Sequence, residues 1–323
     1  MKPLSEILKS YKNKKITITG GFGYIGSVLS NLLYSNCKSL TITSRRSLNK
    51  SRYNHHCVKT LDQNFWKKTI DESDIIFHLA GNTSLYNAEK NPLLNLQESL
   101  HPLHSLGDAL LENPKEIKFI FASTATVYGV SYDRKVSESD KPRPCSYYDF
   151  HKVMCEEYLY LLNRITGLDF VSLRLANVYG PSPMEAGSDD RGVINRVAEK
   201  LSKGETINIY GDGEYYRDYI YIDDVAKSFL LSGVETNKDN RLFNICSGSS
   251  ITLKEAFNEL HHIFKPNSEI GIEYIEWPEH AHEIERRNFY GDNELFKSVF
   301  GWEPEHSFIE GIELLKKATK NAG

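Results

Sequence analysis

A group of closely spaced glycines near the N-terminus constrains the fold of this 323-residue chain most strongly. It follows a β-branched run at residues 15–19 and precedes a helical segment at residues 27–34. Gly20, Gly23 and Gly26 let the backbone turn tightly, so that a pyrophosphate can approach the open N–H groups at a helix N-terminus. A glycine-rich turn without a ligand is the alternative, but the position between a first strand and its helix favours a dinucleotide site. The cofactor contacts expected here are Gly20, Gly23, Tyr24 and Ile25.

Mostly apolar segments alternate with helical ones along the first half of the chain. The former lie at residues 40–43, 74–80, 118–122 and 170–174, and the longer helical patterns lie at 92–111 and 147–163. This alternation is typical of a parallel sheet covered on both faces. We therefore predict an α/β fold with a Rossmann-type doubly wound parallel sheet and a smaller C-terminal α/β substrate domain. The expected division is residues 1–176 for the NAD(P)-binding domain, with segments near 215–250 returning to it, and residues 177–323 mainly for substrate binding.

The composition argues against several classes of function. Lys and Arg number 39 and Asp and Glu number 43, and the resulting net charge of −4 argues against a nucleic-acid partner. No stretch approaches the ~18 apolar residues that span a bilayer, so we expect no membrane association. The five cysteines are scattered and odd in number, which favours reduced thiols and a cytoplasmic location. The histidine pairs lack companion cysteines or acidic residues, so no metal site is expected.

The end of the second expected strand bears on the choice of cofactor. An acidic residue there would bond the adenosine 2′-hydroxyl, but the chain has Thr43-Ser44-Arg45-Arg46. Two guanidiniums can bind a 2′-phosphate through charge-assisted hydrogen bonds. We therefore favour NADP(H), with NAD(H) possible and a solvated pair of arginines as the alternative.

Tyr148 and Lys152 are four residues apart on an expected helix, so their side chains share one face. A free tyrosine hydroxyl is a poor base at neutral pH, but a neighbouring ammonium favours the phenolate. Such a tyrosine can exchange the proton of a sugar hydroxyl while a nicotinamide exchanges hydride. Thr124, at the end of another strand, can hydrogen-bond the reacting oxygen. The alternative for Tyr148 and Lys152 is a pair of side chains on the surface of a helix. The alternative for Thr124 is a residue that caps a turn at the end of its strand.

Taken together, these motifs resemble the extended short-chain dehydrogenase/reductases, and more closely their nucleotide-sugar epimerase/dehydratase group. The similarity includes His78-Leu79-Ala80, the segment 123–129, Asn177 to Pro181, Arg217 to Asp224 and Gly301 to Pro304. The group's order of motifs is kept from about residue 15 to about residue 315.

The resemblance implies roles for several residues. Tyr148 would be the catalytic base and acid, Lys152 would lower its pKa and hold the nicotinamide ribose, and Thr124 would share the sugar hydroxyl. The further cofactor contacts implied are Asp62, for adenine, and Leu79, Ala80 and Gly81. The implied substrate contacts are Asn177, Arg217 and Arg287, on the diphosphate of a nucleotide diphosphate sugar. For Arg217 the alternative is a salt bridge to Asp218 or Asp223. A homodimer through the helices near 93–111 and 147–163 is also implied.

The residues after Thr124 narrow the chemistry. Family dehydratases carry an Asp-Glu pair there and decarboxylases a glutamate, whereas this chain has Ala125-Thr126, which cannot act as acid or base. Two reactions remain open, namely 4-epimerisation and NADPH-dependent reduction of a 4-keto nucleotide sugar. A non-catalytic NADP(H)-binding sensor on the same fold is the alternative of another class. The presence of both Tyr148 and Lys152 disfavours it.

Overall fold

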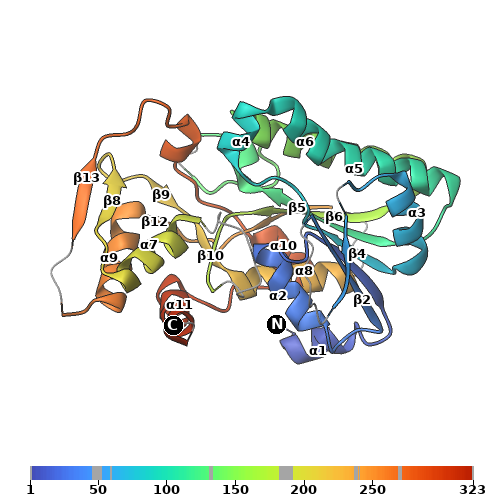
Figure 1. Cartoon of the computed structure of the whole chain (residues 1–323), viewed down its shortest axis with the longest axis horizontal. Coiled ribbons are helices and arrows are strands. Elements are labelled where there is room, and N and C mark those ends of the chain that lie inside the picture. The colour runs from blue at the N-terminus through green and yellow to red at the C-terminus, as the bar shows by residue number, and fades with distance from the viewer. Residues whose placement is uncertain are drawn as a thin grey trace.

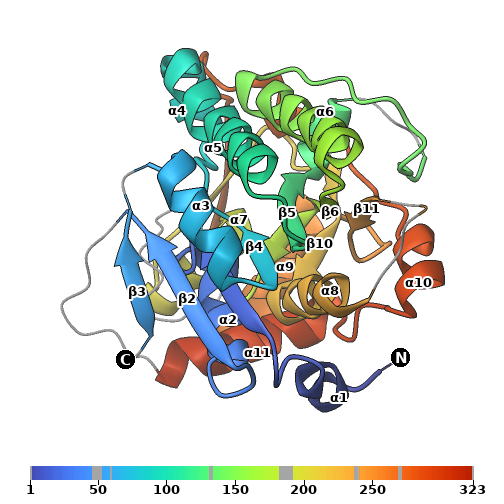
Figure 2. The same cartoon turned by 90° about the vertical axis from the view of Figure 1, so that its right-hand side faces the viewer.

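A seven-stranded, wholly parallel sheet forms the centre of the larger lobe (Figures 1 and 2). The computed structural model describes residues 2–45, 53–58, 60–130, 134–181, 192–235, 239, 241–267 and 271–321. The strand order is β11-β6-β5-β4-β1-β2-β3. In chain order these strands are β1 (Lys15–Thr19), β2 (Ser39–Ser44), β3 (Asn54–Cys57), β4 (Ile75–His78), β5 (Lys118–Thr124), β6 (Asp169–Leu175) and β11 (Leu242–Ile245).

Helices cover both faces of this sheet, as Figure 2 shows. One face packs against α1 (Leu4–Lys9), α2 (Tyr24–Leu33) and α8 (Ile222–Val234), through a core that includes Leu29, Phe77 and Phe229. The other face packs against α3 (Gln63–Glu72), α5 (Pro92–Glu112) and α6 (Tyr147–Thr166), through a core around Trp66 and Phe119. The predicted doubly wound parallel sheet is therefore confirmed. Its strand order reverses between β1 and β4, which is where such sheets bind ligands at the carboxyl ends of their strands.

A smaller group of elements forms the second lobe, at the left of Figure 1. Its helices are α7 (Gly192–Lys203), α9 (Leu253–Phe264) and α11 (Phe308–Asn321), which share one apolar core. Three strand pairs accompany them: β8 (Ile207–Tyr210) with β13 (Ile272–Ile275), β7 (Asn177–Tyr179) with β10 (Tyr219–Tyr221), and β9 (Tyr216–Arg217) with β12 (Ile251–Thr252). The remaining short elements are α4 (Leu85–Lys90), η1 (Ala125–Tyr128), η2 (Glu283–Arg286) and α10 (Glu294–Phe300). Because β11 and α8 belong to the larger lobe, the chain crosses between the lobes more than once.

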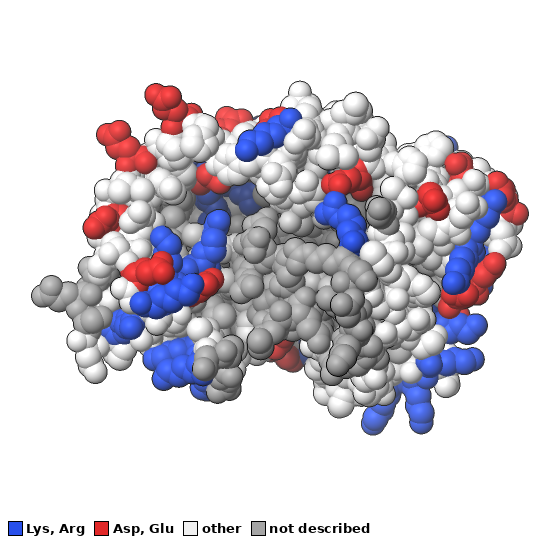
Figure 3. All heavy atoms as spheres, viewed as in Figure 1, with Lys and Arg blue, Asp and Glu red and all other residues white. Residues whose placement is uncertain are grey.

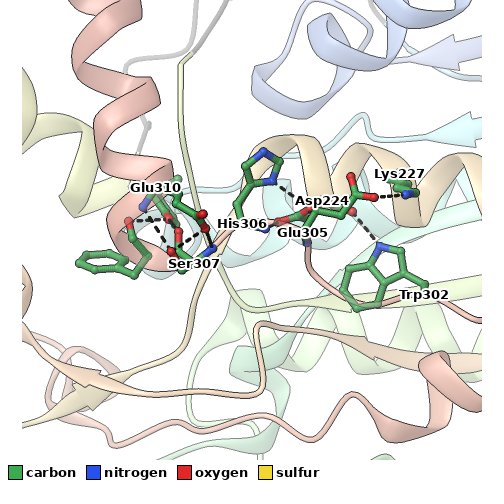
Figure 4. Close-up of polar contacts among 9 residues, drawn as sticks. Asp224, Lys227, Trp302, Glu305, His306, Ser307 and Glu310 are labelled. Carbon is green, nitrogen blue, oxygen red and sulfur yellow. Dashed lines mark hydrogen bonds and ion pairs between the residues drawn. The ribbon is translucent and has the colours of Figure 1, made fainter. Parts of the chain in front are cut away.

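Asp224, in the first turn of α8, forms hydrogen bonds with the segment that leads into α11 (Figure 4). Its carboxylate accepts hydrogen bonds from the backbone N–H groups of Glu305 (2.9 Å) and His306 (3.2 Å). Its carbonyl oxygen accepts one from the indole of Trp302 (3.3 Å), and Lys227 pairs with the Glu305 carboxylate at 2.5 Å. These contacts join the C-terminal helix of the small lobe to a helix of the large one.

Charges are mixed on the face of the molecule shown in Figure 3, where basic and acidic side chains lie interspersed over the described part. Among the described residues no helix is long and apolar enough to cross a membrane.

Candidate active site

The carboxyl ends of β1, β4 and β5 bring several of the predicted residues to one edge of the sheet. Gly20 follows β1 with a φ of 71°, and a Cβ at this position would lie 2.8 Å from the backbone nitrogen of Ala80. Only glycine therefore combines this left-handed backbone with so close an approach to the end of β4. The structure thus places the glycine loop against Leu79 and Ala80.

The glycine loop leads into α2 without a side-chain cap. The N–H of Gly23 donates to Gly20 O at 2.8 Å, and a Cβ at Gly26 would lie only 2.3 Å from that same oxygen. No side-chain cap bonds the N–H groups of the first turn, which suits an anionic ligand. These features fit the pyrophosphate of a nicotinamide dinucleotide, as predicted for this loop.

Tyr24 has a role that the sequence did not indicate. Its hydroxyl donates to Gly180 O (2.9 Å) and accepts from the Asn195 amide (3.0 Å). Because Asn195 lies on α7, this side chain links the start of the cofactor helix to the small lobe. Ile25 is partly buried against the core of the large lobe.

The residues predicted to bind the adenosine end have partners within the protein. Arg45 forms an exposed ion pair with Glu98 at 2.7 Å, and the Ser44 hydroxyl lies 3.0 Å from the His55 ring. Asp62 is the N-cap of α3, where it accepts from the Phe65 N–H at 2.9 Å. Arg46 lies outside the described residues. The NADP(H) preference and the adenine contact stay predictions.

Thr124 and Lys152 lie at the same edge of the sheet, and Tyr148 is on α6, the helix that carries Lys152. The Lys152 ammonium donates to Ala122 O (2.8 Å) on β5, and a Cβ at Gly81 would lie 3.9 Å from it. Burial lowers the pKa of Lys152. Thr124 ends β5 with its hydroxyl 2.8 Å from that of Thr126. Tyr148 is half-buried in the first turn of α6, one turn before Lys152.

A buried ionic network lies next to Thr124 and Lys152 in the chain, and the sequence did not indicate it. Glu156 accepts a hydrogen bond from the Ser123 hydroxyl (2.5 Å) and two from Arg174, at 3.0 and 2.6 Å. All three side chains are buried. Because they connect β5, α6 and β6, they fix the position of α6, which carries Lys152, relative to β5, which ends at Thr124. The sequence feature that could have indicated this network is the position of Glu156, one helical turn after Lys152.

Two arginines are buried together in the small lobe. Arg217 and Arg287 are 8% and 4% exposed, and neither forms an ion pair with the described residues. Within the described part of the chain, Arg217 donates to the backbone oxygens of Tyr216 (3.1 Å) and Glu285 (2.5 Å). In Arg287 one terminal nitrogen is buried without any hydrogen-bond partner. A salt bridge from Arg217 to Asp218 is excluded, since that carboxylate is bound by Ser247 and two glycine N–H groups.

The electrostatics of this pair favour the binding of an anion. Burial lowers the pKa of Arg217, and burial together with the charge of Arg217 lowers the pKa of Arg287 to about 9. Because a guanidinium stays protonated at ordinary pH, the lowered pKa expresses an unfavourable surplus of buried positive charge. A diphosphate would relieve it. By contrast, the neighbouring Arg286 is exposed and lies over the ring of Trp277.

Aromatic side chains adjoin the arginines. Trp277 stacks on Tyr210, with ring centroids 5.2 Å apart, and Tyr215 lies 5.7 Å from Trp277. The Arg217 guanidinium lies 5.2 Å from the Tyr215 ring, so the buried arginines and the aromatic group are continuous. Asn177 has a structural contact, because its amide donates to Asp218 O at 2.9 Å. Its predicted contact with substrate is not tested by this geometry.

Comparison with known proteins agrees with these features. The sequence profile of the family described as "NAD dependent epimerase/dehydratase family" matches residues 16–246. The chain is 30% identical to a dTDP-4-dehydro-6-deoxyglucose reductase from Escherichia coli, over 94% of this chain and 97% of that protein. It is 29% identical to a crystal structure of UDP-glucose 4-epimerase with UDP-glucose from Thermotoga maritima (TM-score 0.84, 95% and 99% covered). It is also 29% identical to UDP-N-acetylglucosamine 4-epimerase from Methanobrevibacter ruminantium in complex with UDP-N-acetylmuramic acid (TM-score 0.83, 97% and 100% covered).

Proposed function

Because this chain belongs to the NAD dependent epimerase/dehydratase family, we propose that it transfers hydride at C4 of a nucleoside diphosphate sugar. The resemblance predicted from its motifs is confirmed at the level of the family, and the chain is an enzyme of the extended short-chain dehydrogenase/reductase type. The names of the reductase and the epimerases given above state that they act on nucleotide sugars, and each match covers nearly the full length of both chains.

The buried pair Arg217 and Arg287 is the observation that carries the proposal. Two buried guanidiniums that form no ion pair with any described carboxylate make a site for a doubly charged group. The aromatic group of Tyr210, Tyr215 and Trp277 beside them offers rings against which a nucleobase can stack. A nucleoside diphosphate combines these two chemistries.

The large lobe supplies the residues for proton transfer at the sugar. Tyr148 takes or gives the proton of the 4-hydroxyl, and Thr124 holds the same oxygen. The Lys152 ammonium, fixed by Ala122 O, favours the phenolate of Tyr148. When bound, the nicotinamide cofactor accepts or supplies the hydride. Neither Ala125 nor Thr126 can eliminate water or manage a carboxylate, so the chemistry stops at hydride exchange.

Two reactions satisfy this arrangement, 4-epimerisation and reduction of a 4-keto sugar. Reduction consumes a reducing cofactor, and the segment Ser44-Arg45-Arg46 favours NADP(H) as its source. We propose NADP(H) as the preferred cofactor on this ground, and a cytoplasmic location belongs to the same proposal. Titrating the protein with NADPH and NADH tests it, and tighter binding of NADH would contradict it.

We also propose a homodimer through α5 and α6. Large apolar side chains are exposed on these helices, namely Leu93, Leu94 and Leu111 on α5 and Phe150, Leu161 and Ile165 on α6. A monomer rarely exposes so many apolar side chains on adjacent helices, whereas a second copy would bury them.

One incubation tests the enzymatic proposal and separates its two forms. The protein is mixed with UDP-, GDP-, CDP- and dTDP-sugars and NADPH, and both NADPH and sugar epimers are followed. Stoichiometric loss of NADPH indicates reduction, whereas an epimer without net loss indicates epimerisation. Turnover that is unchanged in Tyr148→Phe would refute the mechanism, and binding without any turnover would favour the non-catalytic sensor.

A further inference from the structure

Tyr24 belongs to one lobe by its backbone and to the other by its side chain. Its backbone begins α2, the helix start that we assign to the pyrophosphate of the cofactor. Its ring packs against the apolar core of the small lobe. The next residue, Ile25, packs against the core of the large lobe instead. One side chain of the cofactor loop therefore reaches into the other lobe.

A closed set of hydrogen bonds holds the Tyr24 hydroxyl there. It donates to Gly180 O at 2.9 Å and accepts from the Asn195 amide at 3.0 Å. The same amide donates to Gly180 O (2.8 Å), and the amide oxygen of Asn195 accepts from the Gly180 N–H (3.1 Å). Gly180 is closely packed as well, since a Cβ there would lie 2.7 Å from Cγ2 of Ile222. Tyr24, Gly180 and Asn195 thus form a junction between the cofactor loop and the small lobe.

The junction continues by backbone contacts to the proposed diphosphate site. Gly180 directly follows β7, which pairs in parallel with β10. At the start of β7, the N–H and the side-chain amide of Asn177 both donate to Asp218 O, at 3.1 and 2.9 Å. Asp218 is the residue after Arg217. An unbroken series of hydrogen bonds and adjacent residues therefore connects the start of the cofactor helix to an arginine of the diphosphate site.

We propose that Tyr24 is a positioning residue whose hydroxyl, together with Asn195, couples the cofactor site to the diphosphate site. This rests on the proposed function, which assigns the glycine loop to a pyrophosphate and Arg217 to the diphosphate of the substrate. When the backbone of Tyr24 is held by a pyrophosphate, its hydroxyl is held as well, and with it the strand that leads to Arg217. Less ordering then remains when a nucleotide binds. Each ligand therefore tightens the binding of the other, by the same factor.

Tyr24→Phe is the direct test, because it keeps the ring in the core of the small lobe and removes only the hydroxyl. The Kd of UDP is measured by calorimetry without cofactor and with saturating NADPH or NADH, whichever binds more tightly. UDP is the probe because it has no sugar and so does not meet the nicotinamide at the reaction centre. The wild type should bind UDP roughly fivefold more tightly with the cofactor, and Y24F should show a difference of less than about twofold. A merely structural bond would lower the melting temperature of Y24F and leave this factor as in the wild type, which would overturn the proposal.

Two further variants complete the test. Tyr11→Phe is the matched control, because its hydroxyl donates to Leu230 O (2.6 Å) within the large lobe. It should lower the melting temperature and keep the wild-type factor. Asn195→Ala breaks the junction from the small lobe, outside the cofactor loop, and should lose the factor as Y24F does. The double variant Y24F/N195A should lose no more than either single variant, because both act on one junction. A wild-type factor in folded N195A would overturn the proposal.

The same titrations separate this inference from the proposed function. If the wild type binds neither UDP nor a nicotinamide dinucleotide, the proposed function fails and the inference fails with it. If the wild type binds both, but binds UDP equally with and without the cofactor, the inference alone is refuted.

Discussion

Replacing Arg287 with methionine should stabilise the protein while abolishing its response to nucleotide. Methionine has similar length and fills the same buried space without charge. The environment lowers the pKa of Arg287 to about 9 even with the attraction of Asp149 included. Relative to the normal guanidinium pKa, this corresponds to roughly 5 kcal/mol by which the folded protein disfavours the charged form. The variant should recover part of this free energy.

The expected gain is smaller than the full electrostatic figure. Arg287 contributes favourable contacts through its packing over Phe289, 5.2 Å away, and through its buried aliphatic stem. Losing them costs about 1–2 kcal/mol. We therefore expect Arg287→Met to raise the free energy of unfolding by about 2 kcal/mol, in line with other replacements of buried charges. The charge of Arg287 therefore lowers the stability of the protein while it serves to bind the ligand.

Urea unfolding with and without UDP measures both effects. R287M should be more stable than the wild type without UDP and should gain little from adding it. The matched control is Arg286→Met, because Arg286 is adjacent but exposed. It should change the stability by less than about 0.5 kcal/mol and keep the response to UDP. A destabilised R287M would mean that Arg287 has a structural partner, and the reasoning would be refuted.

Three further predictions concern the cofactor, the pH dependence and the assembly. Arg45→Ala should weaken NADPH binding roughly tenfold and leave NADH binding within about twofold, as measured by fluorescence titration; equal losses would contradict the assignment. Burial raises the pKa of Asp218 to about 6, so its contribution to stability is full below about pH 4 and is lost as the pH rises through 6. Between pH 7.5 and pH 5, the free energy of unfolding measured in urea should rise by about 1 kcal/mol more in the wild type than in Asp218→Asn. An equal change in both proteins would refute the raised pKa of Asp218. The double change L161E/I165E should turn a dimer into a monomer by light scattering, whereas the exposed control Y274E should not; a wild type that is already a monomer would contradict the proposed interface.

The parts of the fold that were predictable depend on local patterns. The apolar strands around Ile18, Phe77 and Ile120 and the glycine loop could be assigned because each is a run of adjacent residues. The third strand, β3, was missed, because Asn54-His55-His56-Cys57 has neither an apolar run nor alternation. It forms through pairing with β2 at the sheet edge, which no local pattern encodes.

The candidate site divides in the same way. Tyr148 and Lys152 could be paired from sequence, since four residues on a helix define a common face. The burial of Arg217 and Arg287 and the repulsion between them depend on the fold of the small lobe, and sequence alone supported Arg287 only by resemblance. The ion pair of Arg45 with Glu98 was not predictable, because contacts between residues on different elements are tertiary properties.

The most direct test of the central claim follows the hydrogen at sugar C4. NADPH carrying deuterium at the transferred position is incubated with the panel of nucleotide sugars and their 4-keto forms, and the products are analysed by mass spectrometry. The account predicts a product with deuterium at C4 together with stoichiometric loss of NADPH if the enzyme is a reductase. If it is an epimerase, it predicts a C4 epimer without net loss of cofactor. Both should disappear in Tyr148→Phe. No turnover with any nucleotide sugar, or equal turnover in Tyr148→Phe, would contradict the account.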